Sequence, residues 1–391
     1  MEIGGKVQRL AELSIGSIAI ATLVLAGCGG GSSSSTTSST TTVTTPTTIA
    51  VSNTGLTGIV TTIAGLAGSW GTVNNTGTAA RFNGPGYISS DGTNLYVTDS
   101  LENNIRKIVI ATGAVTTLAG SQTAVSGVTD AQGTAALFNS PRGIATDGIN
   151  LYVADTGNNS VRMIVISSGM VSTLAGSVTG ASGVADATGT AARFWSPSGV
   201  TKMGSSLYVT DAVNSTIRQI NLNTNAVSTI AGTAGILGYS NNLAGSAVMF
   251  DGPADITNDG VSLYVADLLN HDIRKVNPSN GLTTLVAGGA FNTIPASGVT
   301  NGTSSSARFN KPFGLTTDGA NIYVGDTDNH TVRKIVLSSG LVSTLAGSAG
   351  VFGTSDGTGS AARFNNPRGM VYVNGKLYVA DWYNGTIRKI Q

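Results

Sequence analysis

Short runs of Val, Ile, Leu, Thr and Tyr alternate with Gly, Asn and Asp along the chain after residue 57. The run LYVTD at 95–99 returns in closely similar form at 151, 207, 263, 322 and 377. Each copy is followed by a run of the type IRKI and then by one of the type VSTLAG, and a run that begins after a Phe-x-x-Pro step precedes it. Short runs of β-branched and aromatic residues between turn formers are typical of strands. The pattern therefore predicts six units of four strands.

The turns between these strands indicate how each unit folds. Asp-Gly or Asn-Gly pairs separate the first two strands in five of the units: Asp91-Gly92, Asp147-Gly148, Asp259-Gly260, Asp318-Gly319 and Asn374-Gly375. These pairs favour the positive φ angles of tight hairpins, so each unit is expected to be an antiparallel meander. No 10-residue stretch of 58–391 has the apolar spacing of a helix. Six such sheets arranged radially form a six-bladed β-propeller, so the expected fold class is all-β.

The phase of the repeat favours a closed ring. The repeated region begins with VTTIAG at 60 and ends with IRKI at 387, so the last unit lacks its fourth strand and the N-terminal run is spare. We expect this N-terminal strand to complete the last blade and to close the propeller. An open array would leave two unpaired apolar edges, which proteins avoid.

The order and wording of the four runs resemble a known repeat. Strands of the form P-x-G-I-A, L-Y-V-A-D, N-x-x-I-R-K-I and V-x-T-L-A-G resemble the NHL repeat, and the resemblance covers residues 58–391. It implies a six-bladed propeller. NHL proteins mostly bind proteins or glycans, some cytosolic ones bind RNA, and a minority, such as the peptidylglycine amidating lyases, are metal enzymes. The resemblance therefore implies a binding module or, less commonly, an enzyme.

The N-terminus has the layout of a signal peptide. Lys6 and Arg9 precede an apolar stretch, 15–27, that ends in small residues. This stretch is shorter than the roughly 20 residues that a helix needs to cross a bilayer. The sequence LAGC at 25–28 resembles the lipobox of bacterial lipoproteins, which implies that residues 1–27 are removed and that Cys28 carries a covalent lipid.

Residues 28–57 form a Gly, Ser and Thr tract without apolar periodicity, and we interpret them as a flexible tether. A flexible chain of this length spans roughly 30 Å. Gly29 stands where many lipoproteins carry the acidic residue that retains them at the inner membrane, so the resemblance favours the outer membrane. The expected location is the bacterial cell envelope, with a periplasmic or extracellular propeller at residues 58–391 and the lipid as its only membrane contact. Tethers of this composition are also sugar-acceptor stalks, and glycosylation stays open.

Composition and charge exclude several classes of function. The 21 basic and 20 acidic residues give a net charge of +1 without a polybasic block, so a nucleic acid partner is not expected. One Cys and two His cannot form a structural zinc site of the Cys/His type, and one Cys cannot form an internal disulfide. No G-x-S-x-G elbow, P-loop or H-E-x-x-H motif is present.

Residues that recur in every unit are expected to shape the blades. An Asp and an Arg keep a seven-residue offset in all six units: Asp99/Arg106, Asp155/Arg162, Asp211/Arg218, Asp267/Arg274, Asp326/Arg333 and Asp381/Arg388. We favour a cross-strand ion pair within each blade over a ring of catalytic carboxylates. An Asn or Asp also stands eight residues before each Phe, at 74, 130, 186, 242, 301 and 356. One oxygen ligand per loop favours turn formation over calcium binding.

The unrepeated residues between the second and third strands are candidates for a ligand site on one rim. These loops read SLEN, TGNN, AVNS, LLNH, TDNH and WYNG, and the candidates in them are Glu102, Asn158, Asn214, Leu268, His271, His330, Trp382 and Tyr383. Exposed apolar residues on a rim favour contact with a partner. Packing of Trp382 between two blades is an equally open alternative. A metal held by His271, His330 and Asp328, with water in an open position, is a chemically sensible alternative. An amidating lyase needs a third histidine, which this chain lacks.

The sequence thus favours a binding or scaffold module of the cell envelope that presents its rim to a protein or a glycan, with no catalysis and no cofactor. The alternative is a metal-dependent lyase or lactonase that uses His271 and His330. A spacer without a ligand is a third possibility. Neither the ligand nor the oligomeric state follows from the residues.

Overall fold

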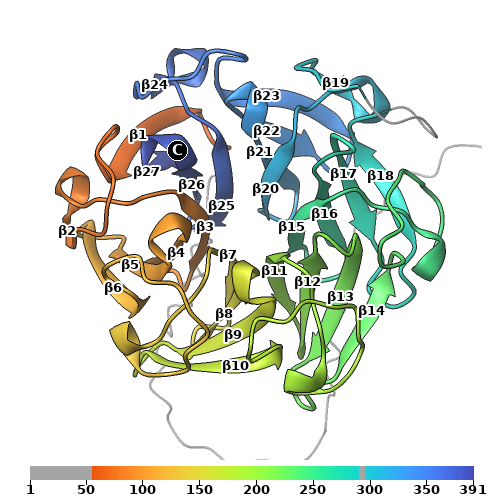
Figure 1. Cartoon of the computed structure of the whole chain (residues 1–391). Helices are drawn as coiled ribbons and strands as arrows, with labels where there is room; N and C mark the ends of the chain where they lie inside the picture. The colour runs from red at the N-terminus through yellow and green to blue at the C-terminus, as the bar shows by residue number, and fades with distance from the viewer. Residues whose placement is uncertain (1–54, 290–295) are drawn as a thin grey trace, which may run out of the picture. The chain divides into compact units, whose positions relative to one another are not determined.

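The computed structural model describes residues 55–289 and 296–391, and these form six antiparallel sheets arranged around an axis (Figure 1). The expectation of an all-β, six-bladed propeller with four antiparallel strands per blade is confirmed. The first three blades contain β3 (Pro85–Ser90), β4 (Asn94–Asp99), β5 (Asn104–Val109) and β6 (Ala114–Gly120); β7 (Pro141–Thr146), β8 (Asn150–Asp155), β9 (Ser160–Val165) and β10 (Met170–Gly176); and β11 (Pro197–Met203), β12 (Ser206–Asp211), β13 (Thr216–Asn221) and β14 (Val227–Ala231).

The other three blades contain β15 (Pro253–Asn258), β16 (Leu263–Asp267), β17 (Asp272–Val276) and β18 (Thr283–Ala287); β20 (Pro312–Thr317), β21 (Asn321–Asp326), β22 (Thr331–Val336) and β23 (Leu341–Gly347); and β25 (Pro367–Val373), β26 (Lys376–Asp381), β27 (Thr386–Ile390) and β1 (Ile59–Ala64). Three two-residue strands extend the outer edges: β2 (Asn75–Thr76), β19 (Gly302–Thr303) and β24 (Gly357–Thr358).

The helices of the described residues are single 3-10 turns in the loops. They are η1 (Gly77–Ala79), η2 (Ser100–Glu102), η3 (Gly133–Ala135), η4 (Thr156–Asn158), η5 (Gly189–Ala191), η6 (Gly245–Ala247), η7 (Ser304–Ser306), η8 (Thr327–Asn329), η9 (Gly359–Ala361) and η10 (Trp382–Asn384). Over these described ranges the search for a helix long and apolar enough to cross a membrane found none.

The hydrophobic core lies between the blades. There are six clusters of buried side chains among the described residues, and each joins two neighbouring blades; one of them also includes Ala254 and Phe313 of the fourth and fifth blades. Both faces of every sheet are therefore covered, which explains why strands such as β4 and β8 are apolar on both faces rather than alternating. Close approach of the inner strands requires glycine, since a Cβ on Gly143 would lie 2.3 Å from the carbonyl oxygen of Ser198 in the next blade.

The N-terminal strand β1 lies in the last blade. It pairs antiparallel with β27, from Val60 opposite Ile390 to Ala64 opposite Ile387. This is the position that the phase of the repeat assigned to the spare strand. The inner strands contact one another in the circular order β3, β7, β11, β15, β20 and β25, and β25 contacts β3.

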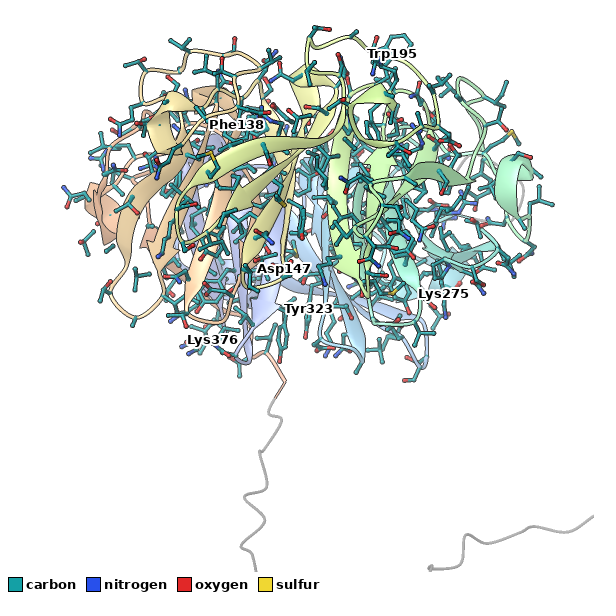
Figure 2. The ribbon with its side chains drawn as sticks, turned by 90° about the horizontal axis from the view of Figure 1, so that it is seen from below. Phe138, Asp147, Trp195, Lys275, Tyr323 and Lys376 are labelled. Carbon is teal, nitrogen blue, oxygen red and sulfur yellow. The ribbon has the colours of Figure 1, made fainter. Side chains whose placement is uncertain are left out.

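The propeller has two different faces. Pro85 lies opposite Asp99, and Asp99 lies opposite Asn104, so the loops before each inner strand and the turns after each second strand share one end of the blades. We name this end the loop face; the other end, the hairpin face, carries the Asp-Gly hairpins. Figure 2 shows Trp195 at the loop face and Asp147 and Lys376 at the hairpin face. The described chain enters at the hairpin face, where the amide of Thr57 donates to the carbonyl oxygen of Gln391 at 2.9 Å.

The predictions for the N-terminal segment fall outside the described residues. These are the signal peptide 1–27, the lipid on Cys28 and all but the last residues of the tether 28–57. They stay predictions.

Candidate ligand-binding site on the loop face

The repeated Asp and Arg residues form one buried ion pair in each blade, as expected. The distances between the Arg Nη1 and Asp Oδ2 atoms range from 2.7 Å to 3.2 Å, and all twelve side chains are at most 1% exposed. Each guanidinium group also lies over the Phe of the Phe-x-x-Pro step, at 5.0 Å to 5.3 Å from its centroid. Each aspartate accepts the backbone amide that follows that Phe. The motif therefore fastens the loop to the blade.

The Asn and Asp residues eight positions before each Phe belong to the same arrangement. Arg162 donates through Nη2 to the carboxylate of Asp130, and Arg218 donates to Asp186 at 2.6 Å. Asn74, Asn301 and Asp356 accept the equivalent bond. In the fourth blade, the carbonyl oxygen of Ser240 is the acceptor in place of Asn242. These oxygen atoms hold an arginine, which extends the expected turn role.

Three polar residues that were predicted at the rim are buried. Asn158 and Asn214 are 4% and 2% exposed. Each donates from Nδ2 to the buried aspartate of its blade at 2.8 Å and to a loop carbonyl oxygen. Glu102 is 9% exposed and accepts from Thr72 at 2.7 Å and from Asn83 at 2.9 Å. Their assignment to an exposed rim is corrected, because their polar atoms are already used within the blade.

The two histidines fasten neighbouring blades. His271 accepts the backbone amide of Lys311 on Nδ1 at 3.0 Å, and His330 accepts that of Asn366 at 3.2 Å. Asn103 and Asn159 make the same bond with Oδ1 in the first two blades. Partial burial lowers the pKa of both histidines, with a further lowering of the pKa of His271 by Lys311. A neutral imidazole is required here, since only an Nδ1 that carries no proton accepts a hydrogen bond.

The third residue of the alternative metal site has other partners. Asp328 forms an ion pair with Lys311 at 2.9 Å and accepts from Asn366 Nδ2 at 3.1 Å. Among residues 55–289 and 296–391, no group of three His, Cys, Asp or Glu side chains is placed to hold a metal ion. A site built on His271, His330 and Asp328 has no support in this geometry.

The predicted apolar and aromatic rim residues divide into two sets. Trp382 is 9% exposed and packs against Gly84 and Gly86 of the first blade, so it lies between blades. Leu268 is half-buried against the core between blades. Tyr383 remains on the surface at 55% exposed. It is the second residue of its turn, a position occupied in blade order by Leu101, Gly157, Val213, Leu269, Asp328 and Tyr383, which we name the turn ring.

A second set of unrepeated residues, which the sequence analysis missed, surrounds the axis. The residue after the strand-initiating Pro differs in nearly every blade, and in blade order it is Gly86, Arg142, Ser198, Ala254, Phe313 and Arg368. We name these six positions the inner ring. The signal was present in the sequence as one variable position between an invariant Pro and a position that is Gly in four of the six blades.

The axis is closed just below the inner ring. The next position is Gly in four blades but Tyr87 in the first and Asp255 in the fourth. The hydroxyl of Tyr87 donates to the carbonyl oxygen of Ala254, in the opposite blade, at 2.9 Å. Its ring lies 5.6 Å from that of Phe313. Burial raises the pKa of Tyr87 well above its usual range, so the hydroxyl stays a donor. Tyr87 therefore crosses the channel.

Below Tyr87, a cavity of about 190 Å³ lies along the axis. Its lining includes Ser89, Thr201, Thr316 and Asp255. Burial raises the pKa of Asp255 to about 7, although backbone amides of Ile256 and Leu315 donate to its two oxygens at 2.8 Å. The cavity is polar but is separated from the loop face.

Above Tyr87, an apolar pocket of about 280 Å³ opens on the loop face between the third and fourth blades. Its lining combines both rings: Ser198, Ala254, Phe313 and Arg142 from the inner ring, and Val213 and Leu269 from the turn ring. Ala212, Leu237, Asp251, Gly252 and Leu268 complete it. Its volume is close to the lower end of small-molecule pockets, roughly 300 Å³.

Arg142 lines this pocket, and Arg368, which is not part of the lining, lies over the same Phe313 ring. The guanidinium carbons of Arg142 and Arg368 lie 5.9 Å and 4.7 Å from the centroid of the same Phe313 ring. Arg368 also stacks on Trp382 at 3.6 Å. Burial and the charge of Arg142 lower the pKa of Arg368 to about 10. The ion pairs found in the described part of the chain all use other cations.

Comparison with known proteins supports the fold and one repeat. The chain is 31% identical over 270 residues to the protein SUPPRESSOR OF QUENCHING 1, chloroplastic, of Arabidopsis thaliana. This matched stretch covers 65% of this chain and 25% of that protein. The chain spans 19% to 40% of the length of the curated relatives it matches.

Two solved structures from Bacteroides thetaiotaomicron share the architecture. A structural genomics protein of unknown function has a TM-score of 0.65 at 21% identity, over 85% of this chain and 75% of that one. An auxiliary nutrient binding protein has a TM-score of 0.64 at 17% identity, over 85% and 76%. At these identities the likeness shows the fold alone. The sequence model of the NHL repeat matches residues 364–390, which span β25 to β27, so the chain carries an NHL repeat in the sixth blade of a six-bladed β-propeller.

Proposed function

We propose that this protein is a binding module of the cell envelope, which holds a protein or a glycan on its loop face and performs no chemistry there. The observation that carries the proposal is the meeting of both unrepeated rings at one apolar pocket beside two arginines without an ionic partner. Residues that vary where their neighbours repeat serve one site rather than the blade. Loops on a rigid closed scaffold supply such sites without disturbing the core.

The turn ring extends this surface outward from the pocket. Leu101, Val213, Leu269 and Tyr383 are between 42% and 55% exposed, although each is a large apolar or aromatic side chain. Their backbone amides are fixed in the loops by hydrogen bonds to preceding carbonyl oxygens. Rigid apolar groups on one rim bury area on binding with little loss of conformational freedom, which favours a partner there.

The same proposal joins the tether to the propeller at a distance from the candidate site. The described chain enters at the hairpin face, beside Gln391, and the candidate site lies on the loop face. The metal-dependent lyase or lactonase alternative is not favoured by any contact of His271 or His330, since both rings accept a backbone amide.

The test is capture from envelope extracts with two matched pairs of variants. Leu101→Asp with Leu269→Asp places charges on the loop face, and Ile149→Asp with Val261→Asp places them at hairpins on the opposite face. Ile149 and Val261 are 69% and 76% exposed, so their replacement should not disturb the core. We expect a species that is captured by the natural chain and by the hairpin-face variant but lost by the loop-face variant. Equal capture by all three proteins would refute the proposal.

A further inference from the structure

We infer that the loop-face pocket takes a small organic acid, with its apolar body against Leu268, Leu269 and Phe313 and its carboxylate at Arg142, near the second positive charge of Arg368. This inference goes beyond the proposed function, since it assigns a small-molecule ligand to the pocket on the same face. It follows from three features of the pocket, which are its shape, its charges and the orientation of its arginines.

The shape fits a compact apolar group. The pocket has a volume of about 280 Å³, and its walls are mainly the side chains of Val213, Leu237, Leu268, Leu269 and Phe313. A neutral sugar would leave most of its hydroxyl groups unpaired against these walls, which costs free energy for each buried polar group. An aliphatic or aromatic body of similar volume gains from leaving water.

The charges favour an anion. Arg142 and Arg368 both lie over Phe313, and their mutual repulsion is one cause of the lowered pKa of Arg368. A carboxylate beside Arg142 would offset the repulsion between the two arginines and would accept hydrogen bonds from the Arg142 guanidinium group. Guanidinium groups suit this role because they offer planar pairs of donors.

The orientation of Arg368 is set before a ligand arrives. Its guanidinium plane stacks on Trp382 at 3.6 Å, and Trp382 is itself packed against the first blade. Little side-chain freedom is lost when a ligand binds to a group that is already held. Asp251 lines the same pocket from the fourth-blade loop, so the acid must enter with its carboxylate toward the axis.

The experiment measures binding of three matched probes to the purified full chain by isothermal titration calorimetry. The probes are 4-phenylbutyrate, 4-phenylbutanol and 4-phenylbutylamine, which share a body and differ in charge. We expect the acid to bind at least tenfold more tightly than the alcohol, and the amine to bind most weakly. Arg142→Met should remove this preference while the affinity for the alcohol is kept, and Asp251→Asn should strengthen binding of the acid.

Controls separate the pocket from general charge and folding effects. Lys376→Met removes a cation from the hairpin face and should leave all three affinities unchanged. Arg368→Met would lose the contact with Trp382 and so could misfold, and therefore Arg368→Lys, which keeps the charge, is used instead. The acid should bind Arg368→Lys more weakly than it binds the natural chain. Equal affinity for acid and alcohol, or an equal effect of Lys376→Met, would overturn the inference.

A peptide arm identifies the source of the carboxylate. A short peptide that ends in Phe is compared with its C-terminal amide. Binding of the free-acid peptide without binding of 4-phenylbutyrate would overturn the small-molecule assignment in favour of a protein C-terminus. If the loop-face variant loses capture but the natural chain binds no acid, this inference is refuted and the proposed function stands. If the natural chain binds the acid but captures no species from the extract, the macromolecular partner is refuted and this inference stands.

Discussion

Replacement of both histidines by asparagine tests whether they fasten blades or serve a metal. Each histidine has a left-handed backbone, with φ of 55° at His271 and 58° at His330. Asn103 and Asn159 have φ of 55° and 54° at the equivalent positions and accept the same interblade amide at 2.7 Å and 2.8 Å. Asparagine tolerates this conformation better than most residues. The double variant His271→Asn, His330→Asn should therefore keep the free energy of unfolding within about 0.5 kcal/mol.

The alanine variants provide the contrast. Alanine keeps the left-handed strain and loses the acceptor, so each substitution should cost about 1 kcal/mol, the net value of a typical hydrogen bond. Urea unfolding followed by tryptophan fluorescence measures both sets. A loss of more than about 1 kcal/mol in the asparagine variant would show that the imidazole does something that an amide cannot do, since that exceeds one hydrogen bond.

The pH dependence of the same variant gives an independent check. Partial burial lowers the pKa of both histidines in the folded state. Their contribution to stability is thus present above the unfolded pKa of about 6.5 and is lost as pH falls below it. The asparagine variant lacks this loss, so its stability relative to the natural chain should rise between pH 7 and pH 5. Metal analysis completes the test, because a stoichiometric ion lost in the variant would contradict the fastening role.

Three further predictions concern the blades and the axis. Asp155→Asn leaves Arg162 buried without the charge of its partner and should lower the free energy of unfolding by about 3 to 5 kcal/mol. Asp130→Asn, at the 42% exposed end of the same network, should lower it by at most about 1 kcal/mol. Urea unfolding measures both variants. The Asp255→Asn variant should become more stable relative to the natural chain as pH rises from 4 to 7, by up to about 4 kcal/mol. The reason is that the raised pKa of Asp255 makes its contribution to the stability of the natural chain fully present only below about pH 4, and this contribution is lost as pH rises through about 7. A difference in thermal unfolding that does not change with pH would refute this. Gly143→Ala should cost about 1 to 3 kcal/mol, since its Cβ would meet Ser198, and an unchanged midpoint of thermal unfolding would refute the packing argument.

The fold could be predicted because every blade repeats the same sequence pattern. Six copies of strand, hairpin and Phe-x-x-Pro step leave few arrangements open, and the offset between Asp99 and Arg106 placed an ion pair correctly across two strands. The pairing partner of β1 followed from the phase of the repeat alone. Comparison of the six units within this one chain thus showed which positions repeat in every blade and which positions vary.

The site was harder to predict, because sequence spacing does not show which way a turn residue points. Asn158 recurs as Asn214 and in three other blades, and recurrence was the signal that it braces the blade rather than meets a ligand. For Trp382 the sequence left the rim and the space between two blades open, and the side chain lies beside Gly84 and Gly86, where no Cβ opposes it. Arg142 and Arg368 reach the same Phe313 ring only through the circular arrangement of the blades.

The close packing of the inner strands around the axis determines which residues fit at the position that follows the inner ring. Four blades place Gly at the position below the inner ring because neighbouring inner strands leave no space for a Cβ, as at Gly369, whose Cβ would lie 2.4 Å from the Cα of Tyr87. Tyr87 and Asp255 depart from this rule in opposite blades, and each gains hydrogen bonds from other inner strands. Tyr87 spans the channel between the loop-face pocket and the polar cavity below, and these two share no lining residue. A ligand of the loop-face pocket would therefore enter and leave through the loop face, and the variable positions there would set its specificity.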